Sequence, residues 1–146
     1  MNLKNILKEK KYLVSDGAWG TQIAKYGVDP GICPELLNVE KPEMLREIGE
    51  SYVNVGSDII LTNTFGGSPQ KLTKYGLEDR LEELNKEGVC RSVEAAGGKA
   101  LVFASIGATG EFLAPLGLTT EIEMIKSYAR QIKAIVEDGA DAIVIE

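Results

Sequence analysis

Four short apolar runs, each followed by a polar or glycine-rich turn, constrain the fold of this chain most. They occupy residues 12–14, 59–62, 99–106 and 142–146. The runs are too short for helices, and the longer ones show no alternation of apolar and polar residues, a pattern typical of strands buried on both faces. We therefore expect four strands inside a single sheet.

The segments between these runs predict helices. Apolar residues recur at helical spacing over residues 43–55, 77–96 and 121–138, with shorter helical stretches at 21–26 and 70–75 and a short charged helix at 1–10. The resulting order, β-α-β-α-β-α-β, requires a parallel sheet with right-handed crossovers. A Gly-x-Asp turn precedes a strand both at 56–58 and at 139–141. This repetition favours a (β/α)8 barrel of the TIM type over an open sheet.

A closed barrel of this type needs eight strands and about 250 residues. The chain has 146 residues and ends at Glu146, directly after the fourth apolar run. We therefore expect residues 1–146 to form a truncated half-barrel with four parallel strands, the N-terminal half of the whole domain.

Composition excludes several functional classes. The net charge is −6 and the acidic residues are scattered, so neither a nucleic-acid-binding surface nor a basic membrane anchor is indicated. No apolar run approaches the roughly 20 residues of a membrane span. The absence of histidine excludes Ser-His and Cys-His catalytic pairs. Cys33 and Cys90 lie far apart, which suggests reduced thiols in a cytoplasmic protein and makes a poor zinc site.

The first apolar run leads into a candidate binding site. Asp16 and Gly17 follow it at the carboxyl end of the expected strand, where ligands bind in α/β proteins. The carboxylate could hold an ammonium group, and the adjacent N–H groups could hold a carboxylate. Alternatively, Asp16 caps the following helix. Glu146, at the end of the fourth run, would point into the same mouth, unless it simply faces water.

Two further loops carry weaker signals. Asn63 and Phe65 follow the second run, and Ser105 lies at the end of the third. These residues could line the same pocket, or Asn63 could satisfy loop backbone groups while Phe65 belongs to the core. We expect Trp19 to serve packing. Residues 107–110 (Gly-Ala-Thr-Gly) suggest a phosphate loop, but no Gly-Lys-Ser/Thr follows them, which argues against that function.

Several motifs, in order, resemble one enzyme family. They are residues 16–22 (Asp-Gly-Ala-Trp-Gly-Thr-Gln), 34–38 (Pro-Glu-Leu-Leu-Asn), 52–65, 104–110 and 139–146. Together they resemble the homocysteine S-methyltransferase family, most closely the homocysteine-binding barrel of its cobalamin-dependent branch; the betaine-dependent branch is the alternative. The resemblance implies a (β/α)8 barrel in which zinc, held by three cysteines, lowers the pKa of the homocysteine thiol so that it accepts a methyl group and gives methionine.

The resemblance also implies which residues bind substrate. Asp16, Gly17 and Glu146 match positions that hold the amino-acid end of homocysteine, and Asn63 and Phe65 match positions that line the pocket. The predicted substrate-binding set is completed by two residues that lie beside them, Ala18 and Ser105.

The chain departs from the family in one respect. The family's zinc cysteines lie in Gly-x-Asn-Cys and Gly-Gly-Cys-Cys contexts, and neither context occurs here. We therefore expect no catalytic residue, no zinc and no cobalamin on residues 1–146, and no methyl transfer by these residues alone. In the whole enzyme a cobalamin module would bring the methyl group.

Two alternatives remain open from the residues. The first is an assembly module whose exposed strand edges pair with a second copy or with the missing C-terminal half. The second is a complete small α/β enzyme that uses Asp16 and Glu146 for acid–base chemistry.

Overall fold

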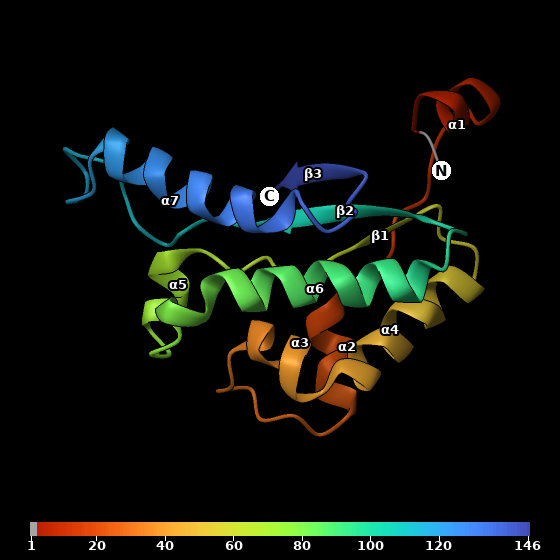
Figure 1. Cartoon of the computed structure of the whole chain (residues 1–146), viewed down its shortest axis with the longest axis horizontal. Coiled ribbons are helices and arrows are strands. Elements are labelled where there is room, and N and C mark those ends of the chain that lie inside the picture. The colour runs from red at the N-terminus through yellow and green to blue at the C-terminus, as the bar shows by residue number, and fades with distance from the viewer. Residues whose placement is uncertain (1–2) are drawn as a thin grey trace.

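A parallel three-stranded sheet organises the computed structural model, which describes residues 3–146 (Figure 1). Its strands are β1 (Ile59–Leu61), β2 (Leu101–Ile106) and β3 (Ala142–Ile145), in the order β1-β2-β3. Ile60 is paired with Val102, and Ser105 with Val144. The chain thus has the α/β class and the parallel sheet that the apolar runs predict.

The expected strand at residues 12–14 does not form, so the prediction of four strands is wrong for the described residues. This segment runs parallel to β1 but forms only a single bridge, between Ser15 and Ile59. Backbone hydrogen bonds join Asp58 N to Val14 O and Asp16 N to Ile59 O, at 2.8 and 2.9 Å. Pairing stops there because the chain turns away at Gly17 into a helix.

Helices lie before and between the strands along the chain, in the expected order. The longer ones are α4 (Pro42–Asn54), α6 (Leu81–Ala96) and α7 (Glu121–Ile135). The others are α1 (Leu3–Glu9), α2 (Trp19–Lys25) and α5 (Pro69–Thr73). Residues 1 and 2 of the helix predicted at 1–10 lie outside the described residues. Among residues 3–146, no helix combines the length and apolar character needed to cross a bilayer.

Residues 34–40 form helical turns before α4. The 3-10 turn η1 (Pro34–Leu36) continues into α3 (Leu37–Glu40), and a second such turn, η2 (Glu78–Arg80), precedes α6. Pro34 at the first position of η1 has the backbone angle that a helix start requires.

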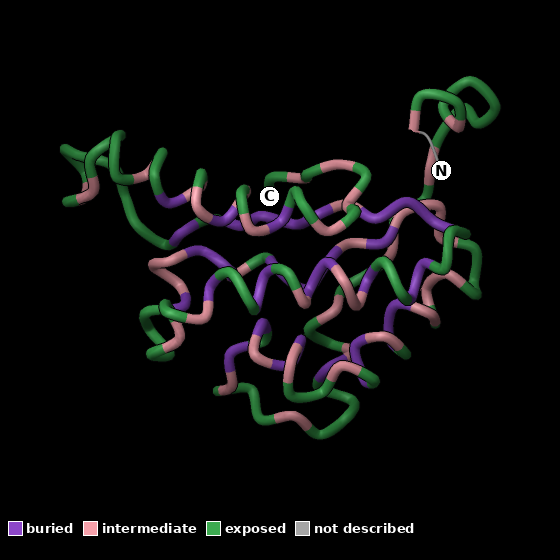
Figure 2. Tube along the Cα trace, viewed as in Figure 1, coloured by how far each residue is buried: buried purple, intermediate pink, exposed green. Residues whose placement is uncertain are grey.

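The core lies between α6 and its neighbours. In Figure 1, α6 runs beneath β2, and it contacts α4 on one side and α7 on the other. Figure 2 shows buried backbone along β2 and along one side of α6. The α4–α6 contact is close because residue 49 is glycine: a Cβ atom there would lie 2.7 Å from the Cβ of Ala95.

Strand β3 differs from the other two in burial. Its residues alternate between half-buried and exposed, and Ile145 is 74% exposed. In contrast, all of β2 except Phe103 is buried. The expectation of burial on both faces is therefore wrong for β3, because one of its faces, the one that carries Ile143 and Ile145, is exposed in the described part of the chain.

Leu84 on α6 tests the packing of this core. It is fully buried with Cys33, Leu72 and Leu81. Replacing it with alanine should lower the free energy of unfolding by about 2–5 kcal/mol, because the substitution leaves a cavity. Urea denaturation measures this change. The matched control is Leu118→Ala, at a side chain that is 99% exposed, with an expected change below about 0.5 kcal/mol. Equal effects at the two positions would contradict the packing described here.

Candidate functional site

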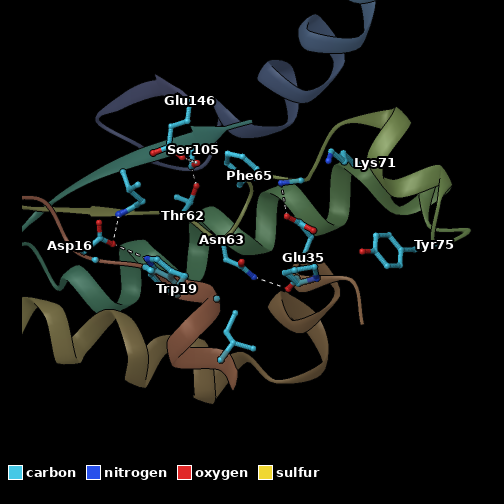
Figure 3. Close-up of a pocket in the computed structure, with 17 residues that line it drawn as sticks. Asp16, Trp19, Glu35, Thr62, Asn63, Phe65, Lys71, Tyr75, Ser105 and Glu146 are labelled. Carbon is cyan, nitrogen blue, oxygen red and sulfur yellow. Dashed lines mark hydrogen bonds between the residues drawn. The ribbon is translucent and has the colours of Figure 1, made fainter. Parts of the chain in front are cut away.

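A cavity of about 630 Å³ opens at the carboxyl ends of the strands. Figure 3 shows its lining residues, which come from the turn at 16–20, the start of η1, the loop after β1, α5, and the ends of β2 and β3. All seven residues of the predicted substrate-binding set line this cavity: Asp16, Gly17, Ala18, Asn63, Phe65, Ser105 and Glu146. The structure therefore brings them together, although they are up to 130 positions apart in the sequence.

The Asp16 carboxylate ties the N-terminal turn to the sheet. Its Oδ2 accepts hydrogen bonds from Trp19 Nε1 and from the backbone N–H of Leu61, both at 2.8 Å. Within residues 3–146, its Oδ1 accepts only from the Ser15 hydroxyl, at 3.0 Å. Asp16 does not cap α2, whose N-cap is Ala18 and lacks a side-chain cap. One carboxylate oxygen thus serves structure, and the other has capacity for a ligand.

Trp19 has a second role beyond the packing expected of it. Its ring packs against the apolar cluster of α2 and α4, while its indole N–H fixes the orientation of Asp16. Tyr52 on α4 holds the same turn by donating a hydrogen bond to Ala18 O at 3.1 Å. A Cβ atom on residue 17 would lie 3.2 Å from the Tyr52 hydroxyl oxygen, so glycine at position 17 permits this close approach.

The loop after β1 is held by side-chain hydrogen bonds. Asn63 donates both amide hydrogens, to Pro34 O at 2.7 Å and to Asn38 Oδ1 at 2.9 Å, so its side chain secures the neighbouring backbone, as the alternative interpretation proposed. Only the oxygen of its side-chain amide, Oδ1, is left for a ligand. Phe65 does not belong to the core: it is 47% exposed. A Cβ atom on residue 107 would lie 2.5 Å from the Phe65 ring, so the ring packs against glycine.

Ser105 and Glu146 join the ends of β2 and β3. The Ser105 hydroxyl donates to Glu146 Oε2 at 3.1 Å, and the backbone N–H of Glu146 donates to Ile106 O at 3.0 Å. The side chain of Glu146 therefore points along the cavity wall, and its Oε1 has no hydrogen-bond partner among the described residues.

Sequence reasoning missed Glu35, which also lines the cavity. Its side chain is buried, with 3% of the residue exposed. Its carboxylate accepts from the backbone N–H of Gly66 at 2.7 Å and from the Cys33 thiol at 3.3 Å. Glu35 thus fixes the far end of the β1 loop. The only sequence signal was its position in the Pro-Glu-Leu-Leu-Asn motif, where an acid within an apolar segment indicates a buried carboxylate.

The described residues do not fit a zinc site. Residues 3–146 contain no group of three His, Cys, Asp or Glu side chains placed to hold a metal ion. Burial, and then the charge of Glu35, raises the pKa of the Cys33 thiol to about 11, which opposes formation of the thiolate that zinc binds. Burial also raises the pKa of Cys90, which lies on α6.

Comparisons with known proteins give one consistent result. The sequence model of a family described as homocysteine S-methyltransferase matches residues 13–146. A methionine synthase of Mycobacterium tuberculosis is 32% identical over 157 residues, which cover 99% of this chain and 13% of the relative. A methionine synthase of Mycobacterium leprae is 31% identical and is covered to 12% of its length. The chain thus spans about an eighth of the length of these relatives.

Solved structures show the same fold. The metallated form of the Escherichia coli homocysteine methyltransferase MmuM has a TM-score of 0.82 at 22% identity, over 99% of this chain and 56% of that one. The oxidized form has a TM-score of 0.80 at 20% identity, over 97% and 55%. At these identities the likeness shows the fold alone.

Cys33 provides a test of burial at the edge of the cavity. Its pKa of about 11 keeps the thiol protonated at pH 8, with only about one molecule in a thousand as the reactive thiolate. Iodoacetamide should therefore label Cys90 first and label Cys33 only after unfolding in urea, as peptide mass spectrometry would show. Labelling of native Cys33 at the rate of Cys90 would contradict the buried site.

Because burial raises the pKa of Cys33, the free energy of unfolding should also fall as pH rises from about 9 to 11.

Proposed function

Because the chain belongs to the homocysteine S-methyltransferase family, we propose that it forms part of an enzyme that methylates homocysteine to methionine, and that its cavity binds homocysteine. The observation that supports this most is the convergence of all seven expected residues on one cavity at the carboxyl ends of the strands. The sequence similarity to methionine synthases favours the methionine synthase branch of the family over its betaine-dependent branch.

The polar groups of the cavity match the two charges of an amino acid. Asp16 Oδ1 and Glu146 Oε1 are carboxylate oxygens with free hydrogen-bonding capacity, suited to an ammonium group. The backbone N–H groups of Gly17 and Ala18 donate to no other described residue. They are suited to the substrate carboxylate, because successive free N–H groups at a turn attract anions. The half-exposed Phe65 ring would cover the aliphatic part of the substrate.

In this proposal the 146 residues form the N-terminal half of a (β/α)8 barrel. The single bridge at Ser15 and the strands β1 to β3 would be consecutive members of the barrel wall. Zinc would activate the homocysteine thiol when bound, and cobalamin carried by another module would deliver the methyl group. Since the described residues do not fit zinc, we assign its ligands to cysteines outside this chain and derive no metal-dependent step here. The chain's own residues bind and orient the substrate.

A second role, in assembly, is suggested by the outer edge of the sheet. Strand β3 has no neighbouring strand on one side among residues 3–146, and two of its own side chains, Ile143 and Ile145, are exposed. An uncovered strand edge with apolar side chains pairs readily with another strand. We propose that this edge receives the rest of the barrel and, when that is missing, a second copy of the chain.

Homocysteine binding by the chain tests the proposed substrate. Isothermal titration with L-homocysteine should give a saturable signal. Asp16→Asn or Glu146→Gln should weaken the affinity about tenfold or more, because each removes a charge-assisted hydrogen bond worth about 1.5–3 kcal/mol. Glu137→Gln is the matched control, since Glu137 is exposed and lies outside the cavity, and it should leave the affinity unchanged.

Two results would refute this assignment. One is the absence of saturable binding by the folded chain. The other is an equal loss of affinity in all three variants. Thermal unfolding of each variant separates a loss of binding from a loss of folding.

Sedimentation tests the role of the strand edge. The chain should form a dimer whose fraction rises with concentration. Ile145→Lys should shift the chain to monomer, because a charge on an edge strand opposes pairing. Val55→Lys places the same charge at an exposed apolar side chain next to α4 and should leave the dimer intact. A chain that stays monomeric at high concentration excludes self-pairing through β3.

A further inference from the structure

Lys71 of α5 and Lys74, the residue that caps the end of α5, meet the loop after β2 at the rim of the cavity. Lys71 lines the cavity, and Lys74 lies one turn further along the chain. Gly110 lies between them: a Cβ atom built there would be 3.6 Å from Lys71 Nζ and 3.5 Å from Lys74 Nζ. Both ammonium groups therefore approach the same point of the backbone, although α5 and this loop are more than 30 residues apart in the sequence.

These two positive charges are not neutralised within the described part of the chain. Neither ammonium group forms an ion pair or a hydrogen bond with any of residues 3–146. In contrast, the guanidinium groups of Arg46, Arg80 and Arg130 are all paired with glutamates. Two like charges that share one point repel each other, and a bound anion would remove this repulsion.

The backbone of the loop adds hydrogen-bond donors at the same place. The N–H groups of Ala108, Thr109 and Gly110 donate to no other described residue. Gly110 has a φ of 83°, in the left-handed region. Successive free N–H groups in a turn of this kind form anion-binding concavities. The two ammonium groups thus approach a segment whose backbone donors are free among the described residues.

This arrangement changes the interpretation of residues 107–110. Their sequence suggested a phosphate loop, but no lysine follows them, so the sequence argued against it. The structure supplies Lys71 of α5 and Lys74 at its C-cap instead, from a different part of the chain. The two features that a phosphate loop combines in one segment, free N–H groups and a lysine, are here combined by folding.

We propose that Lys71, Lys74 and the backbone at residues 108–110 bind an oxyanion, the carboxylate or phosphate group of a ligand, at the rim of the cavity. In Figure 3, Asp16 lies on the left of the residues drawn and Lys71 on the right. A homocysteine molecule held by Asp16 and Glu146 would leave this rim free. The oxyanion is then assigned to the methyl donor or its carrier, and this part of the inference depends on the proposed function.

Nuclear magnetic resonance of the ¹⁵N-labelled chain tests the site without homocysteine, so that its outcome is independent of substrate binding. Sodium phosphate and, in a second titration, sodium acetate are added at constant ionic strength kept with sodium chloride. We expect saturable shifts of the amide signals of Ala108, Thr109 and Gly110. Saturation by phosphate alone identifies a phosphate group, and saturation by acetate identifies a carboxylate.

Paired variants establish which charges are responsible. The double variant Lys71→Gln/Lys74→Gln should weaken anion binding at least tenfold. Lys41→Gln/Lys99→Gln removes the same charge at two lysines outside the cavity and should bind like the unmodified chain. Signals outside the loop report whether each variant stays folded. Shifts that do not saturate with either anion, or shifts that are equally large in both double variants, would overturn the proposal.

Discussion

The hydrogen bonds of the Asp16 carboxylate are the interaction on which the site depends. A single oxygen, Oδ2, accepts from the Trp19 indole and from the backbone of Leu61, the last residue of β1. Because Trp19 is anchored in the cluster formed by α2 and α4, this carboxylate couples the helical layer to the end of the sheet. It also compensates for the missing first strand, since only one bridge joins the segment before Asp16 to β1.

A buried polar network supports the opposite wall of the cavity. Asn38 donates to Asn63 O and to Leu84 O, both at 2.9 Å, and Gln131 of α7 donates to Thr64 O at 2.8 Å. Low polarity strengthens such hydrogen bonds, so these contacts fix the backbone of the β1 loop against α3, α6 and α7. Gly88 makes this possible, because a Cβ atom at its position would lie 2.6 Å from Thr64 Cγ2.

Periodicity predicted the elements whose environment is uniform. The helices at 43–55 and 121–138 and the strand at 99–106 appear near their expected positions, because each buries one continuous apolar surface. The first strand failed because hydrophobic pattern cannot show how far a segment pairs. Strand β3 is more exposed than its sequence suggests, since burial depends on a neighbour that the pattern cannot specify.

The lining of the cavity was predicted in part for a similar reason. Residues at the ends of the expected strands, such as Asp16 and Ser105, could be placed at one edge because parallel strands share their carboxyl ends. Glu35 and Lys71 could not, because they reach the cavity from helical segments whose packing the sequence does not encode locally. The second function of Trp19 was missed for the same reason, as its hydrogen bond requires the turn at Gly17.

The central claim is that this cavity holds the amino-acid end of homocysteine. A crystal structure of the chain grown with L-homocysteine tests it most directly. We expect the substrate ammonium within hydrogen-bond distance of Asp16 and Glu146, and the substrate carboxylate at the N–H groups of Gly17 and Ala18. Homocysteine bound elsewhere, or bound here with its ammonium turned away from both acids, would contradict it.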